Sequence, residues 1–325
     1  MTDQPPPLDL ESHPVRRLLR ERILVLDGAT GTYLQGLELS ASDFGGPQYE
    51  GCNEHLVFTR QDAVLGMHRA YLDAGADIVE TNTFGGTPLV LAEYGLAERA
   101  REINATAARL ARQACAEFAT PGRPRFVAGS MGPTTKSISV TGGVTFEELL
   151  EHYRVQALGL TEGGADFLSL ETIQDTLNAK AALLGIDAAF EELGRAIPVG
   201  VSCTIEPMGT MLAGQSVDAF YTSLEHRDLL FVGLNCSTGP RFMTDHLRTL
   251  AGIARAPTLC MPNAGLPDEN GRYNESPGQI AEVLGKFAEH GWLNLVGGCC
   301  GTTPEHVRAI AAAVSRHRPR SDWPR

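Results

Sequence analysis

Eight short apolar runs, separated by longer segments of helical character, constrain the fold of this chain more than any other feature of its sequence. Each run is rich in Val, Ile and Leu and is followed by a polar or glycine-rich turn. Continuous apolar runs of this length are typical of parallel strands that are buried on both faces. The runs occupy residues 23–26, 77–80, 125–128, 166–170, 198–201, 230–234, 257–260 and 293–296.

The segments between the runs carry signals for helix starts. Thr59 precedes one helical pattern, and Thr145 and Glu148 have the spacing of a capping box. The pair Ser276-Pro277 places a cap before a proline at the first helical position. Strands that alternate with helices form right-handed βαβ units. Eight such strands predict a single (β/α)8 TIM barrel. A doubly wound open sheet is the competing architecture.

The predicted domain organisation is one barrel with two short ends. Residues 1–14, which include three consecutive prolines, are expected to be a disordered lead-in. Residues 15–316 are expected to form the barrel, and the basic residues 317–325 a flexible tail. A chain of 325 residues suits one α/β barrel.

Charge and composition exclude several classes of function. The formal net charge of -12 disfavours partners such as nucleic acids and acidic lipids. We find neither a signal peptide nor an uninterrupted apolar stretch of about 18 residues, so no membrane span is expected. Seven cysteines, an odd number, favour reduced thiols and a cytoplasmic protein over a disulfide framework.

Three cysteines follow two of the predicted strands. Cys236 comes after the sixth run, and Cys299 and Cys300 come after the eighth. The active sites of TIM barrels lie at the carboxyl ends of the strands, and alternate strands contribute to the same layer, so these thiols can converge. Three thiolates with an open fourth position suit a catalytic zinc ion at this rim, whereas a structural zinc site normally has four protein ligands.

The spacing of these cysteines alone leaves alternatives open. Adjacent residues of a regular strand point to opposite faces, so both Cys299 and Cys300 reach one metal only if the backbone turns there. Glycines on both sides of the pair permit such a turn. The alternatives are core packing and a vicinal disulfide. Core packing is the prediction for the other four cysteines, namely Cys52, Cys115, Cys203 and Cys260.

Carboxylates and amides also follow the predicted strands. Asp27 and Glu171 end apolar runs, and the glycine-rich loop after Asp27 lets backbone approach a ligand, so a carboxylate pair there can hold an amino group. The alternative for each is a surface or capping role. The expected substrate-binding set is Asp27, Gly28, Glu80, Asn82, Glu171 and Asn235.

The nine histidines show no paired metal-binding spacing. Four lie on predicted helices and are expected at the surface or at helix ends: His68, His226, His290 and His306. No general base among the histidines is required for the chemistry considered below.

Five segments together resemble the homocysteine S-methyltransferase family, and within it the N-terminal homocysteine-binding barrel of cobalamin-dependent methionine synthase. The segments are residues 24–32, 78–84, 233–236, 262–267 and 297–304. The last of these, with its Gly-Gly-Cys-Cys-Gly sequence, is the most specific. The resemblance extends from about residue 20 to residue 315, which is nearly the whole chain.

The resemblance implies a zinc-dependent methyltransferase with homocysteine as substrate. It places one zinc ion per chain on Cys236, Cys299 and Cys300, and it places Asp27 and Glu171 near the homocysteine amino group. The homocysteine sulfur then takes the fourth zinc position as a thiolate and accepts a methyl group, which gives methionine.

The methyl donor is where the sequence departs from the family pattern. Methionine synthase is a long chain with folate and cobalamin modules, and the present sequence ends after the homocysteine barrel. The expected donor is methylcobalamin or methyltetrahydrofolate, delivered by separate corrinoid and folate-binding proteins as partners. The alternatives are a betaine or S-methylmethionine donor with the same zinc chemistry, a subunit that is inactive without its corrinoid partner, and a non-catalytic homocysteine-binding or redox protein.

Overall fold

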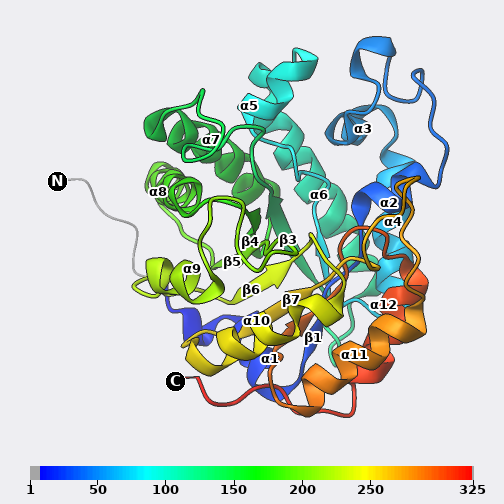
Figure 1. Ribbon diagram of the computed structural model, residues 1–325. Helices are drawn as coiled ribbons and strands as arrows, with labels where there is room; N and C mark the ends of the chain where they lie inside the picture. The colour runs from blue at the N-terminus through cyan, green and yellow to red at the C-terminus, as the bar shows by residue number, and fades with distance from the viewer. Residues whose placement is uncertain (1–7, 324–325) are drawn as a thin grey trace.

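Eight parallel strands lie at the centre of the structure (Figure 1). The structure, a computed structural model, describes residues 8–323. Neighbouring strands pair in parallel from β2 through β8, and β8 pairs with β1. A further parallel bridge joins Leu26 to Ile78 and closes the barrel between β1 and β2. The strands are β1 Leu24–Val25, β2 Ile78–Glu80, β3 Phe126–Met131, β4 Phe167–Ile173, β5 Val199–Cys203, β6 Val232–Asn235, β7 Thr258–Met261 and β8 Leu295–Val296.

Helices surround this barrel on its outer side (Figure 1). The main helices of the βα units are α4 Gln61–Ala74, α6 Ala100–Phe118, α7 Phe146–Gly163, α8 Thr176–Leu193, α9 Val217–Leu224, α10 Pro240–Ile253, α11 Pro277–Glu289 and α12 Pro304–Val314. Shorter elements are α1 Pro14–Glu21, α2 Thr30–Gln35, α3 Leu56–Thr59 and α5 Pro88–Leu91, with 3-10 turns η1 Leu10–Ser12, η2 Pro47–Tyr49, η3 Asn53–His55, η4 Ala92–Tyr94 and η5 Ala97–Arg99. The predicted (β/α)8 barrel is thus confirmed, and the open sheet is excluded.

Local sequence determines several of these helix starts. The capping box at Thr145 and Glu148 is present at the start of α7, and Ser276 forms another with Gln279 at the start of α11. Thr59, however, is not the cap of α4, and that prediction was wrong. Thr59 ends the separate turn α3, and α4 begins after Arg60 without a side-chain cap.

The amino-terminal end of the barrel is closed by helix α1. Val15 and Leu19 of α1 are fully buried against the barrel interior, where Phe167 and Phe231 pack edge to face with ring centroids 6.1 Å apart. Such packing buries large apolar surface and leaves no open channel through the barrel. A ligand site within the barrel is therefore expected at the carboxyl ends of the strands.

The end of the described chain packs onto α1. The indole of Trp323 is only 4% exposed, and the guanidinium groups of Arg16 and Arg20 lie 4.2 and 3.8 Å from the centre of its ring. Its N–H donates to the carbonyl of Arg320, 2.7 Å away. Residues 317–323 are therefore docked where the sequence predicts a flexible tail, because a tryptophan and an arginine find partners there. Residues 324–325 of that tail, and residues 1–7 of the predicted lead-in, lie outside the described residues. The rest of the predicted disordered lead-in is ordered, because residues 10–12 form η1 and α1 begins at Pro14.

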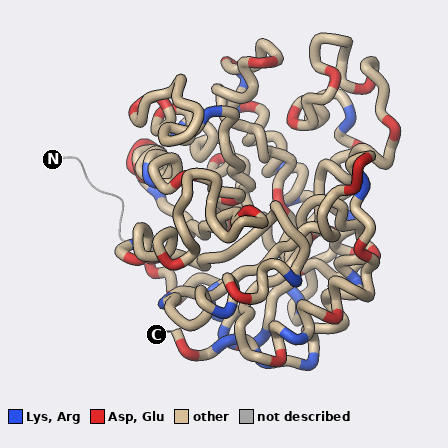
Figure 2. Tube along the Cα trace, viewed as in Figure 1, with Lys and Arg blue, Asp and Glu red and all other residues tan. Residues whose placement is uncertain are grey.

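Acidic and basic residues are distributed along the helices and loops of the whole molecule (Figure 2). Among the residues that the structure describes, no helix is both long enough and apolar enough to cross a membrane.

His68 on α4 contradicts its predicted surface position. Its side chain is completely buried, and neither ring nitrogen has a hydrogen-bond partner within the described chain. Burial lowers the pKa of His68 to about 4, because the cationic ring is poorly solvated there. The reason for the misprediction is that α4 packs on both neighbouring helices, α6 and α12, and against β2.

Replacing His68 with phenylalanine is expected to flatten the acid dependence of stability. The unfolded chain binds a proton at this residue below pH 6.5, whereas the folded chain does so only near pH 4, so wild-type stability is lost as the pH falls through this window. At pH 5 the loss from this residue is about 2 kcal/mol. Urea unfolding of both proteins at pH 8 and pH 5 checks this. An equal loss on acidification in the two proteins would contradict it.

A thiol and carboxylate cavity at the carboxyl ends of the strands

A cavity of about 240 Å³ opens at the carboxyl ends of the strands. We call it the rim cavity. Its walls come from the loops after β1, β2, β6 and β8 and from the ends of β3, β4 and β7. The lining residues are Gly28, Ala29, Thr30, Gly31, Asn53, Glu54, Glu80, Thr81, Asn82, Thr83, Phe84, Ser130, Glu171, Cys236, Met261, Gly298, Cys299 and Cys300.

The three predicted cysteines meet in one wall of this cavity. The sulfur of Cys300 lies 3.8 Å from that of Cys236 and 4.0 Å from that of Cys299, and all three sulfurs lie within 4.8 Å of one another. Each residue is partly exposed. Hydrogen bonds from the Cys236 and Cys299 thiols lower the pKa of Cys300, so the cluster holds a thiolate readily. The other four cysteines are buried apart from this group, as predicted.

The backbone at Cys299 and Cys300 turns as the sequence requires. The Cys299 N–H donates to the carbonyl of Pro262, and the Cys300 carbonyl accepts from Ala264, so the loop after β7 holds both residues. Gly301 follows with φ of +80°, a left-handed conformation that strains other residues. These bonds point two adjacent thiols into one cavity.

Substitution of Gly301 by alanine is expected to damage the site severely. A Cβ at this position falls 2.2 Å from the Cβ of Tyr273, and the positive φ adds strain of its own. We expect unfolding free energy to fall by roughly 3 kcal/mol or more. Gly278 in the first turn of α11, where a Cβ meets no atom within 4 Å, is the matched control and should tolerate alanine. Urea unfolding measures this free energy, and an equally small decrease in both variants would refute the role given to Gly301.

Buried carboxylates are the second chemical group in this cavity, beside the thiols. Glu80 and Glu171 line it, and both are nearly completely buried. Burial raises the pKa of Glu171 to about 7 and raises that of Glu80 well above its usual value, and Glu171 adds to the effect on Glu80. None of the described residues that line the cavity is Lys or Arg. Buried carboxylates without a basic partner indicate a ligand that supplies a positive charge.

Two of the predicted substrate residues lie behind the wall. Asp27 is fully buried, and its Oδ2 accepts the backbone N–H of Glu80 while Oδ1 has no partner within the described chain. Asn235 is 1% exposed and bonds Ser202, the backbone and side chain of Thr172, and Glu171. The structure thus places Gly28, Glu80, Asn82 and Glu171 at the cavity surface and Asp27 and Asn235 one layer deeper.

Several residues that line or contact the cavity were not predicted from the sequence. Ser130 lies near the end of β3, two residues after the third apolar run, and donates to Glu171 over 2.6 Å, so its position was a usable signal. Glu54 comes from the long loop after β1, and its carboxylate accepts the Gly85 N–H. The sequence pattern gives no indication that Glu54 reaches the cavity, because the segment between β1 and α4 folds irregularly over the rim. The hydroxyl of Tyr273 bonds Cys300 from the loop after β7.

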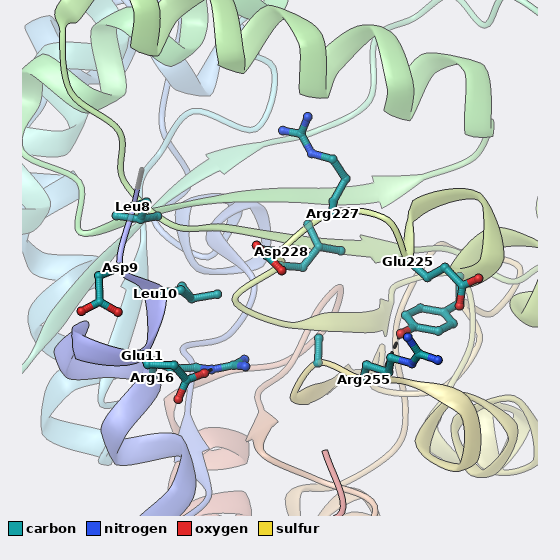
Figure 3. A pocket seen from close by; sticks show the side chains of 12 residues that line it. Leu8, Asp9, Leu10, Glu11, Arg16, Glu225, Arg227, Asp228 and Arg255 are labelled. Carbon is teal, nitrogen blue, oxygen red and sulfur yellow. Dashed lines mark hydrogen bonds and ion pairs between the residues drawn. The ribbon is translucent and has the colours of Figure 1, made fainter. Parts of the chain in front are cut away.

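A second cavity, of about 480 Å³, lies at the amino-terminal end of the barrel (Figure 3). It is bounded by Leu8, by Arg16 of α1 and by residues that precede β6 and β7, among them Asp228 and Arg255. Acidic and basic side chains are mixed on its walls, and Arg16 is already paired with Glu11. Chemistry in TIM barrels is found at the other end, so the rim cavity is the candidate active site.

Comparison with known proteins agrees with this choice. Residues 24–314 match the family described as homocysteine S-methyltransferase. A curated relative, the methionine synthase of Mycobacterium leprae (strain TN), is 46% identical over 301 residues. The match covers 92% of this chain and 25% of the relative, so the chain spans about a quarter of the length of that protein.

Solved structures share the fold. The metallated form of the homocysteine methyltransferase MmuM from Escherichia coli superposes with a TM-score of 0.76 and 24% identity, covering 92% of this chain and 99% of that one. The oxidized form of the same protein gives a TM-score of 0.75 and 22% identity, with 94% and 99% covered. At these identities the likeness concerns the fold.

Proposed function

Because this chain belongs to the homocysteine S-methyltransferase family, we propose that it transfers a methyl group to the sulfur of homocysteine and forms methionine. The observation that carries the proposal is that three convergent thiols and two buried carboxylates without a basic partner line one small cavity. The first group suits a thiophilic metal and the second an ammonium group.

The thiols fit a zinc ion. Zinc binds thiolate sulfur at about 2.3 Å in a tetrahedron, which sets the sulfur atoms about 3.8 Å apart. The Cys300 sulfur lies 3.8 and 4.0 Å from the other two sulfurs, which agrees with that spacing. Cys236, Cys299 and Cys300 would hold the ion and leave its fourth position toward the cavity, the ligand pattern of catalytic rather than structural zinc. When bound, zinc would lower the pKa of a coordinating substrate thiol, so that its sulfur is a nucleophilic thiolate at neutral pH.

The carboxylates would bind the substrate's amino group. Glu80 and Glu171 line the cavity, and Asp27 supports Glu80 from behind through the backbone N–H of Glu80. An ammonium group placed between them supplies the missing positive charge and lowers the free energy of the ionised carboxylates. Thr30 and Gly31 open helix α2 at the cavity, and their backbone N–H groups are candidates for the substrate's own carboxylate.

The proposed donor is a methyl group on a corrinoid, supplied by a separate corrinoid protein or module with methyltetrahydrofolate as its source. The similarity to one quarter of methionine synthase supports this choice. The three thiols line the cavity and are partly exposed, which suits the approach of a bulky donor from outside the barrel. Three reduced thiols at the site suit the reducing environment of the cytoplasm.

A panel of donors tests the proposal. The purified protein with zinc and L-homocysteine should form methionine from methylcobalamin, and faster when a methylated corrinoid protein is supplied. Betaine and S-methylmethionine should give at most a few per cent of that rate. Turnover that is faster with either small donor would reassign the donor. No methionine from any of the four would overturn the proposed function.

A further inference from the structure

The thiol of Cys236 sits on a strained turn. Cys236 has φ of +64° and Ser237 has φ of +60°, so two consecutive residues with side chains adopt the left-handed conformation. Each such residue is less stable than ordinary backbone by roughly 1–2 kcal/mol. The Cys236 N–H donates to Met261, and its carbonyl accepts the N–H of Thr238. A strained arrangement of this kind persists only where surrounding contacts hold it.

The end of β5 and the residues just after it supply those contacts. Ser202 donates its hydroxyl to the side-chain oxygen of Asn235 at 2.7 Å, and Thr204 donates to the Asn235 carbonyl at 2.8 Å. Two residues further, the carboxylate of Glu206 accepts the hydroxyl of Ser237 at 3.0 Å. All three side chains therefore contact residues 235–237, the segment that carries Cys236. We call Ser202, Thr204 and Glu206 the β5 ladder.

We propose that the β5 ladder positions Cys236 for metal binding, with Glu206 as the residue that fixes the turn beyond the strand. The ladder forms hydrogen bonds with the residues on both sides of Cys236, which are Asn235 and Ser237. Cys299 and Cys300 are held independently by the loop after β7, so Cys236 is the thiol whose place depends on β5. Its sulfur already lies 3.8 Å from that of Cys300, the spacing that a tetrahedral thiolate site needs. This inference rests on the proposed function, because it concerns the metal that the thiols hold.

The test measures zinc affinity by competition with a chromophoric chelator, which is independent of turnover. Glu206→Ala and Ser237→Ala should each weaken zinc binding about tenfold, the scale typical of residues that orient metal ligands. The double variant should also lose about tenfold, because both changes break one hydrogen bond. Glu206→Gln, whose amide oxygen still accepts from Ser237, should stay within about threefold of wild type. Glu269→Ala, an exposed carboxylate on the loop after β7, is the matched control.

Three outcomes overturn the inference. The first is wild-type zinc affinity in Glu206→Ala, and the second is a loss of affinity of about 100-fold in the double variant. The third is a loss of affinity in Glu206→Gln as large as that in Glu206→Ala, which would indicate a role for charge alone. If Glu206→Ala does not fold, Ser237→Ala and Glu206→Gln decide the matter, because they change few contacts. Absence of zinc binding by the wild-type protein would overturn the proposed function itself, so the two failures are distinguishable.

Discussion

Replacing Cys299 with alanine is expected to reduce bound zinc from one ion to less than a tenth of an ion per chain, and kcat/KM for methionine formation about 1000-fold or more. Two thiols remain, and they cannot complete the three-ligand site seen in the geometry. A free thiol is only a few per cent thiolate at pH 7, which accounts for about 30-fold. Loss of the fixed position of the substrate sulfur accounts for the rest.

The control for this experiment is Cys115→Ala. Cys115 is a buried cysteine on α6, outside the thiol cluster, so the same change there should leave zinc content and activity intact. Residual activity of the Cys299 variant should recover partly at pH 9, where free homocysteine ionises. Metal analysis by mass spectrometry together with a methionine assay decides the result, and full activity in Cys299→Ala would refute the metal site.

Glu171→Gln is expected to weaken the use of homocysteine about 100-fold in kcat/KM while making the substrate-free protein more stable. The loss reflects a buried charge pair with the substrate's ammonium group, at about 1.4 kcal/mol for each factor of ten. The variant should also discriminate poorly between homocysteine and 4-mercaptobutyrate, which lacks the amino group. Glu289→Gln, an exposed carboxylate at the end of α11, is the control.

The stability gain of this variant has a defined pH window. Burial raises the pKa of Glu171 to about 7, so the folded protein resists ionisation there while the unfolded chain ionises near pH 4.5. Wild-type stability therefore decreases as the pH rises from 4.5 to 7. The glutamine variant lacks this loss and should be more stable by roughly 1–3 kcal/mol at pH 8 but not at pH 4. Unchanged selectivity and an unchanged melting temperature at pH 8 would remove Glu171 from the binding site.

The sequence predicts the barrel well because its determinants are local. Apolar runs identify all eight strands, and the capping box at Thr145 identifies the start of α7. Prediction from the sequence fails where tertiary packing determines the position of a residue. His68 is buried by helices on both sides, and Trp323 docks the predicted flexible tail onto α1. Neither burial is visible from periodicity, because each depends on partners far away in the chain.

The candidate site was predictable to a different degree in its two halves. The thiols follow strands, and the rule that barrel chemistry lies at strand ends brings Cys236 to the adjacent pair. The depth of each side chain was not predictable. Asp27 and Asn235 end strands like Glu80 does, yet they lie one layer behind the cavity wall. The β5 ladder was equally hidden, because it is defined by hydrogen bonds between side chains and residues about 30 positions away in the chain.

X-ray absorption at the zinc edge determines whether the three thiols present an open metal position to the homocysteine sulfur. The zinc-loaded protein should show three sulfur neighbours at about 2.3 Å together with one lighter atom. Addition of L-homocysteine should convert this shell to four sulfurs. A shell that already contains four protein ligands, or one that does not change with homocysteine, would show that the zinc has no open position for the substrate sulfur.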